Sequence, residues 1–185
     1  MIEQIFETIE KKEGFLGGIL KVFEIEENEI KANINLMDWK VIIEIGKNFK
    51  NKENIIKDVI LHEVAHWKIC PKDIINHYKL FEIVYKDFKG EYANYILNAF
   101  EDLIVNAYNK IENPPYEGQG EFFKIQISKG NSKFYKFFVI LNLYLWDEKE
   151  SIKEFFKDFN LNKKEDFGIL KDVEEILKVW KLPLN

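Results

Sequence analysis

The sequence predicts an α+β fold in which a small, mostly antiparallel sheet precedes a series of helices. Three observations support this prediction. Three stretches before residue 46 alternate between apolar and polar side chains or are rich in β-branched residues, as strands are. Two longer stretches, 52–69 and 91–110, carry apolar residues at three- and four-residue steps and contain no proline or glycine. Aromatic residues at helical spacing return near the C-terminus, which predicts C-terminal helices.

The N-terminal part should form one helix and three strands. Residues 2–12 place apolar side chains at helical spacing, and a glycine-rich stretch ends this helix. The strands are expected at residues 19–26, 30–36 and 39–45. The last of these comes just before the 52–69 helix.

The helix predicted over residues 52–69 contains the pentapeptide His62-Glu63-Val64-Ala65-His66. Residues four apart lie one turn apart on the same helix face, so His62 and His66 can place two imidazole nitrogens on one ion. Glu63 lies about a quarter-turn away, where it can take a proton from a water bound to that ion. Two of the three histidines of the chain fall in this motif, which favours a metal site. The alternative is that both are structural and bind no metal.

A second polar feature follows on the helix expected at residues 91–110. Its surface is mostly apolar, which predicts burial, but one narrow stripe is polar. The stripe consists of Asn94, Asn98, Glu101, Asp102, Asn106 and Asn109. Buried amides and carboxylates need partners or a metal, so we expect the stripe to face the histidine helix rather than solvent. Catalytic zinc takes three protein ligands, and a carboxylate of this stripe would be the third. The helical wheel does not choose between Glu101 and Asp102.

These segments together resemble a known family. The string His62–Trp67, then Cys70-Pro71 with Asp73, then residues 98–106 are similar to the zincin-type metallopeptidases of archaea, over about residues 55–110. The resemblance implies a zincin-like fold, a Zn²⁺ ion bound by His62, His66 and Asp102, and Asn98 and Asn106 as groups that support the ligands. It also implies hydrolysis of peptide bonds by a zinc-activated water, with Glu63 as general base. The strand at 39–45 occupies the place of the zincin edge strand, so the resemblance implies that it is the edge of the sheet and that an extended peptide could pair with it. A relation to the gluzincins would make Glu101 the third ligand instead.

Other residues near the site leave alternatives open. The alternative function is a catalytically inactive zincin-like protein, stabilised by its metal, that binds or regulates a partner. A donor to the substrate oxygen is not identified, and Tyr92, Tyr108, Tyr116 and His77 are the candidates. We expect His77, on a helix over residues 72–88, to be partly exposed or capped. Cys70 is expected to be a buried free thiol rather than a ligand.

The rest of the chain adds expectations about organisation and environment. We predict a metal-binding core at residues 1–113 and a C-terminal helical extension packed on it at 114–185, unless the whole chain is one domain. An extended segment is expected at 121–128, and helices at 131–146, 150–158 and 170–181. The net charge of −5 and the absence of arginine argue against a nucleic-acid partner. A single cysteine and no stretch that could cross a bilayer favour a cytoplasmic protein. The resemblance to metallopeptidases implies a peptide or protein substrate. The sequence does not predict an oligomeric state.

Overall fold

The structure is a computed structural model that describes residues 1–15, 17–27, 29–88, 90–126, 138–139 and 141–143. The chain divides into two compact units, Met1–Gly118 and Gln119–Asn185. The first unit contains every residue predicted for the site. The division at residues 113 and 114 stays a prediction, and the helices expected at 150–158 and 170–181 lie outside the described residues.

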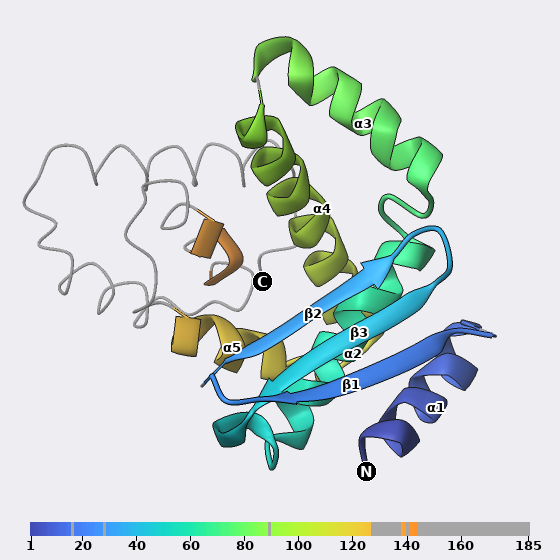
Figure 1. Cartoon of the computed structure of the whole chain (residues 1–185), viewed down its shortest axis with the longest axis vertical. Coiled ribbons are helices and arrows are strands. Elements are labelled where there is room, and N and C mark those ends of the chain that lie inside the picture. Colours follow the sequence, from blue (N-terminus) through green and yellow to red (C-terminus); the bar gives the residue numbers. More distant parts are fainter. Residues whose placement is uncertain (16, 28, 89, 127–137, 140, 144–185) are drawn as a thin grey trace, which may run out of the picture. The chain divides into compact units, whose positions relative to one another are not determined.

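The elements of the first unit follow one another as the sequence predicts, in an α+β arrangement (Figure 1). Their bounds are α1 Ile2–Glu13, β1 Ile19–Ile25, β2 Ile30–Asn35, β3 Lys40–Gly46, a 3₁₀ turn η1 at Lys47–Phe49, α2 Glu53–Lys68, α3 Ile74–Asp87 and α4 Glu91–Glu112. The class and the order of these elements are therefore confirmed.

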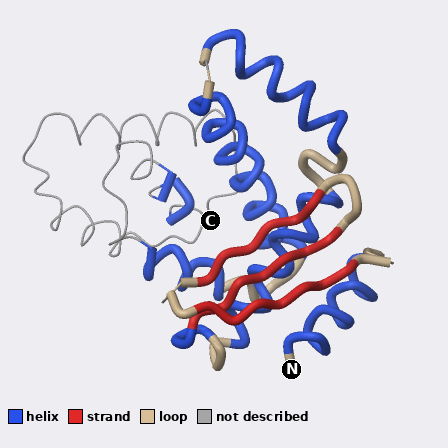
Figure 2. The backbone as a smooth tube through the Cα atoms, viewed as in Figure 1, coloured by secondary structure: helices blue, strands red, loops and turns tan. Residues whose placement is uncertain are grey.

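The sheet is mixed, whereas a mostly antiparallel sheet was predicted. Its strand order is β1-β3-β2, with β3 parallel to β1 and antiparallel to β2 (Figure 2). The connection from β1 to β2 therefore passes the end of β3. There the Gly46 N–H donates to the Glu29 carbonyl at 2.8 Å, and a side chain at Gly46 would collide with the Glu27 carbonyl. The β3 strand is thus central in the sheet, and the prediction that residues 39–45 form its edge was wrong.

Helix α2 is the centre of the first unit. It contacts α1, α4, β2 and β3, and its residues from Val59 to His66 are all buried. The apolar residues of β3 alternate in burial, with Val41, Ile43 and Ile45 almost fully covered, so the sheet has one buried face. A helix covered on all sides belongs in a core. The fold therefore carries His62, Glu63 and His66 into the interior.

The remaining described elements surround this core or belong to the second unit. Helix α3 has no fully buried residue, although its bounds agree with the predicted helix. Helix α5, Gly118–Gln126, includes residues for which an extended segment was expected. That prediction was wrong because short apolar runs do not separate strand from helix, and here the Phe123 ring packs on Phe138 within the second unit. No helix among the described residues is long and apolar enough to cross a membrane.

Candidate metal centre

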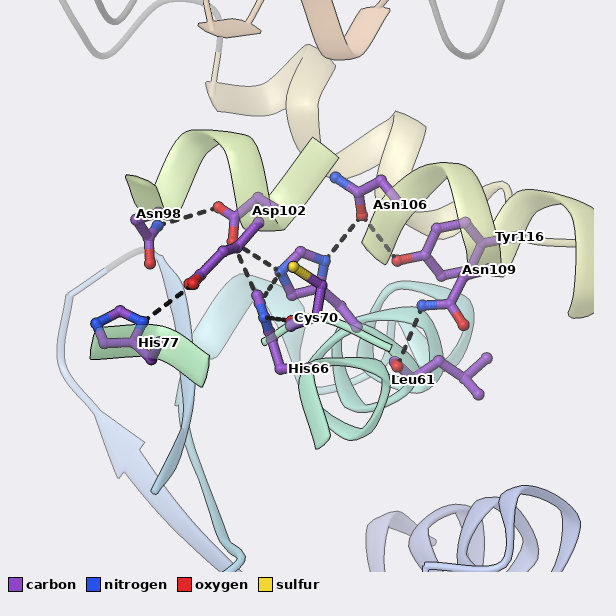
Figure 3. A network of polar contacts seen from close by, with 11 residues as sticks. Leu61, His66, Cys70, His77, Asn98, Asp102, Asn106, Asn109 and Tyr116 are labelled. Carbon is purple, nitrogen blue, oxygen red and sulfur yellow. Dashed lines mark hydrogen bonds and ion pairs between the residues drawn. The ribbon is translucent and has the colours of Figure 1, made fainter. Parts of the chain in front are cut away.

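Three side chains from two helices converge on one point. His66 projects from α2 and Asp102 from α4 (Figure 3). His62 lies one turn before His66 on α2, and α4 packs against α2. The two histidine Nε2 atoms lie 3.2 Å apart. Asp102 Oδ1 lies 3.4 Å from Nε2 of His62 and 3.2 Å from Nε2 of His66. In the described part of the chain, this is the group of His, Cys, Asp and Glu side chains that could hold a metal ion.

The far nitrogen of each imidazole is fixed by an oxygen acceptor. His62 Nδ1 lies 2.8 Å from Asn106 Oδ1, and His66 Nδ1 lies 2.8 Å from the Cys70 carbonyl oxygen. A carbonyl-type oxygen only accepts, so each Nδ1 carries the proton and donates it. In the neutral ring, Nε2 then holds a lone pair directed at the convergence point. Such a bond on the far nitrogen orients a metal-binding histidine and selects its tautomer.

The acceptor for His62 is itself held in place. Tyr116 donates its hydroxyl to the same Asn106 Oδ1 at 3.1 Å, and both residues are almost fully buried. Burial, together with the charge of Asp58, raises the pKa of the Tyr116 phenol well above its usual value, so the hydroxyl keeps its proton. Asn109, one turn from Asn106, donates to the Leu61 carbonyl at 3.2 Å. The polar stripe of α4 thus faces the histidine helix at these positions, as predicted.

The segment that carries Tyr116 is attached to the turns of α2 that precede His62. The buried Asp58 carboxylate accepts the Gly118 N–H at 2.7 Å. Lys57 donates to the Pro115 carbonyl at 3.4 Å. A side chain at Gly118 would collide with the backbone of Asn54, so glycine allows the segment to lie directly on the helix.

In the metal-free protein, hydrogen bonds and opposite charges link His62 and His66 to Asp102 and shift the pKa values of His66 and Asp102. Burial lowers the pKa of His66, but the hydrogen bond to Asp102 and the charge of Glu63 outweigh it and raise the pKa to about 9. Burial likewise raises the pKa of Asp102, and its hydrogen bonds to His62 and His66 reverse this and bring the pKa to about 2. The carboxylate is therefore ionised, and a proton on His66 occupies the place that a metal cation would take.

Glu63 lies on the same cavity as the three convergent side chains. The cavity has a volume of about 250 Å³, and the Glu63 side chain is 7% exposed. Burial raises the pKa of Glu63, while the neighbouring His62 and His66 charges and a hydrogen bond from the Ile34 backbone lower it in part. A buried carboxylate with a raised pKa is a stronger base than an exposed one.

The walls of the cavity come from β2 on one side and from α3 and α4 on the other. Its lining residues beyond the centre are Ala32, Asn33, Ile34, Leu36, Pro71, His77, Asn98 and Glu101. Asn98 donates to Asp102 Oδ2 at 3.2 Å and so steadies the carboxylate. Asn94, the first residue of the predicted stripe, is exposed and does not join the site.

Glu101, the alternative third ligand, does not reach the convergence point. Its Oε1 lies 3.0 Å from Nδ1 of His77, and Asp102 instead faces the histidines. Burial raises the pKa of Glu101, and the charge of His77 opposes the shift. His77 is partly exposed, as expected, and it lines the cavity, where a candidate donor to the substrate oxygen has to lie. Its contact with Glu101 was not predicted, and the histidine count could have pointed to it, because all three histidines of the chain line this one cavity.

Cys70 contributes its backbone to the site rather than its sulfur. Its carbonyl binds His66, while burial and the charge of Glu101 raise the pKa of the thiol to about 11. A protonated thiol is a poor metal ligand. The side chain agrees with the expected buried free thiol.

No family model, no curated protein and no solved structure matches this chain. The geometry of the site therefore provides the evidence on its function.

Proposed function

We propose that this protein is a zinc-dependent metallopeptidase with a zincin-like site, in which His62, His66 and Asp102 hold the ion and Glu63 is the general base. The observation that carries the proposal is the spacing of the three donor atoms. Zinc is bound tetrahedrally at about 2.0–2.2 Å by imidazole and carboxylate donors, which places neighbouring donors about 3.3–3.6 Å apart. The three separations here are 3.2, 3.2 and 3.4 Å.

The chemistry of the donors supports the same ion. Two imidazoles and one carboxylate form a borderline-soft set that zinc accepts, and three protein ligands leave a fourth position for water, as in catalytic sites. Both histidines already have their Nδ1 protons engaged, so the lone pairs on Nε2 remain for the metal. The negative charge of Asp102 and the neighbouring Glu63 favour positive charge at this point, which a metal cation would supply in place of the proton on His66.

The residues of the chain would divide the work of peptide hydrolysis among them. Zinc, when bound, supplies Lewis acidity, which lowers the pKa of a water and polarises a carbonyl group. Glu63 follows His62 in the same turn and lines the same cavity, so it can accept the proton of the attacking water. It can then pass that proton to the amine that leaves. His62 and His66 are kept in orientation by Asn106 and Cys70 throughout.

The substrate would be an extended peptide beside β2. Among the described strands, β2 is an edge of the sheet, and the cavity that Glu63 lines is also lined by Ala32, Asn33, Ile34 and Leu36. An exposed strand edge can pair with a peptide backbone by strand addition. This places the scissile bond between the strand edge and the three donor atoms.

The substitution Glu63→Gln tests the proposal. The variant should bind one equivalent of zinc, because the amide replaces a group that does not coordinate the metal, and it should lose cleavage of a mixed peptide library. Retained cleavage by this variant would contradict the role of Glu63. Stoichiometric zinc without any turnover by the natural protein would favour a metal-stabilised binding protein instead.

A further inference from the structure

Tyr116 is a buried phenol close to the metal centre that does not line the cavity beside it. It lies in the segment after α4, and its hydroxyl is directed at the Asn106 amide oxygen, to which it donates at 3.1 Å (Figure 3). The same oxygen accepts the Nδ1 proton of His62 at 2.8 Å. Because Tyr116 is only 1% exposed and lies outside the cavity lining, its hydroxyl is not placed to touch a substrate. Its hydrogen bond acts on the protein itself.

The direction of the hydrogen bonds around Tyr116 is set at a backbone carbonyl. The Leu61 carbonyl can only accept, and Asn109 donates an amide N–H to it at 3.2 Å. The oxygen of the same Asn109 amide accepts an N–H of Asn113 at 2.9 Å. The two ends of the Asn109 amide are therefore assigned, with its nitrogen toward Leu61 and its oxygen toward Asn113.

The Asn109 amide in turn orients the Tyr116 hydroxyl. Burial and the charge of Asp58 raise the pKa of the Tyr116 phenol, and a hydrogen bond with the Asn109 side chain opposes this shift. A hydrogen bond that lowers the pKa of a phenol stabilises the phenolate, so it is donated to the phenol oxygen. An amide nitrogen carries two N–H groups, which allows Asn109 to bind Leu61 and Tyr116 together. The Tyr116 proton is then left to point at Asn106.

The orientation of the Asn106 amide decides which nitrogen of His62 can bind a metal. With its oxygen toward both partners, Asn106 accepts from Tyr116 and from His62 Nδ1, so the neutral ring keeps its lone pair on Nε2. A rotated amide would present an N–H group to His62 Nδ1 and move the ring proton to Nε2, where it would block the metal position. The rotation would also remove the acceptor of the buried Tyr116 hydroxyl, which is unfavourable. Tyr116 therefore opposes this rotation.

Tyr116 can act in this way because its segment is held on α2. Asp58 lies one turn before His62, is 1% exposed and accepts the Gly118 N–H at 2.7 Å. A side chain at Gly118 would collide with the Asn54 backbone, so the segment lies in direct contact with the helix. The helix that carries the metal-binding histidines therefore also fixes the position of the phenol.

We propose that Tyr116 is a positioning residue of the metal centre, which holds the Asn106 amide in the orientation that leaves the His62 Nε2 lone pair for the metal. The segment 113–118 is then part of the centre although it supplies no ligand. This inference rests on the metal site of the proposed function and not on peptide hydrolysis. Loss of a group that orients a metal-binding histidine weakens metal binding roughly 10–100-fold, and Tyr116 acts through one further residue, so we expect about 10-fold.

The test uses the full-length protein, zinc and three variants. Tyr116→Phe removes the hydroxyl and keeps the buried ring. Tyr108→Phe is the matched control, because Tyr108 loses the same group but packs against the Lys68 ammonium group. Gly118→Ala keeps every polar side chain and displaces the segment from α2. After the melting temperature of each metal-free protein, two quantities are measured. One is zinc affinity, by competition with a chromophoric chelator. The other is the rate at which the His62 Nδ1 proton exchanges with water in the zinc-loaded protein, by NMR with ¹⁵N-labelled histidine.

The proposal predicts that Tyr116→Phe weakens zinc binding about 10-fold and speeds exchange of the His62 Nδ1 proton, whereas Tyr108→Phe changes neither. Gly118→Ala should also weaken zinc binding. Its effect should largely disappear when it is combined with Tyr116→Phe, because both changes act through the same hydroxyl.

Three results would overturn the proposal while zinc binding by the natural protein stands. They are an unchanged zinc affinity in Tyr116→Phe, a weakened affinity with an unchanged exchange rate of the His62 proton, and a Gly118→Ala effect that persists in full in the double variant. A natural protein that binds no zinc would overturn the metal site and this proposal together. Zinc binding that Tyr116→Phe weakens as predicted, in a protein that cleaves no peptide, would support this proposal and contradict the peptidase function.

Discussion

Zinc binding should release a proton from His66, and the structure gives the size of this effect. In the metal-free protein the pKa of His66 is about 9, because the Asp102 hydrogen bond and the Glu63 charge outweigh its burial. Since pH 7 is about two units below this pKa, the imidazole is almost entirely protonated at pH 7. Zinc must displace that proton before it can use the Nε2 lone pair.

The displaced proton sets a pH dependence. Each unit by which the pH lies below the His66 pKa makes the free energy of zinc binding less favourable by about 1.4 kcal/mol. At pH 7 zinc should therefore bind roughly 100-fold more weakly than it would bind to a deprotonated site. His66 alone should therefore make the association constant rise about tenfold per pH unit between pH 6 and 8. About one proton should leave His66 for each zinc bound at pH 7.

Isothermal titration calorimetry measures this release directly. Zinc is titrated at pH 7 into the metal-free protein in two non-chelating buffers of different ionisation enthalpy, and the difference in apparent binding enthalpy counts the protons. The Glu63→Gln variant is the comparison, since it removes a second buried carboxyl group and one of the charges that raise the His66 pKa, so it should release a smaller fraction of a proton. Zinc binding to the natural protein without proton release, or with an affinity that is constant from pH 6 to 8, would refute the assigned hydrogen-bond network.

Four further predictions follow from other contacts. Asp102→Asn should lose most zinc affinity while the matched Glu101→Gln keeps it, as measured by metal content after dialysis, since Glu101 faces His77. Asn106→Leu should weaken zinc binding about 10–100-fold, because His62 Nδ1 loses its acceptor, and the absorption spectrum of the Co²⁺-loaded protein should change with it; an unchanged affinity would show that Asn106 does not orient the ligand. Without metal, the His66 pKa of about 9 exceeds its unfolded value of 6.5, so the protonated imidazole should stabilise the folded state fully below pH 6.5. This contribution, up to about 3 kcal/mol of unfolding free energy, should be lost as the pH rises through 9. Urea unfolding at pH 6 and pH 9.5 checks this, and the difference between the two should be smaller in His66→Ala. Gly46→Ala should destabilise the protein by more than about 1 kcal/mol, because its methyl group meets the Glu27 and Glu29 backbone, whereas Ala at the exposed Gly14 should act only through its positive φ of 74°.

The histidine pair could be predicted because its geometry is local. The spacing of His62 and His66 within one uninterrupted helix is enough to bring their nitrogens together, whatever the rest of the chain does. The burial of α2 and the polar stripe on α4 also follow from composition along a helix. The prediction that the stripe faces the histidines is confirmed for Asp102, Asn106 and Asn109.

The third donor required tertiary information. Glu101 and Asp102 differ by only about 100° around α4, and the rotation of α4 against α2 decides which of them meets the histidines. That rotation is set by contacts far apart in sequence, such as the bond from Asn109 to the Leu61 carbonyl. Tyr116 and His77 were named only as candidates, because their positions depend in the same way on a returning segment and on the packing of α3.

The order of the strands in the sheet could not be predicted from the local sequence either. The strand segments were predicted correctly, but a short connection between β1 and β2 favoured direct pairing of those two strands. In the structure β3 lies between them, which the backbone contact at Gly46 permits. The consequence for function is that β2, rather than β3, is the strand whose edge borders the cavity.

The metal content of the native protein tests the central claim most directly. Inductively coupled plasma mass spectrometry on protein purified without added metal should find one equivalent of zinc per chain. The His66→Ala variant, prepared in the same way, should have lost it. Zinc absent from the natural protein even after reconstitution, or equally present in the variant, would contradict the metal site and the peptidase function built on it.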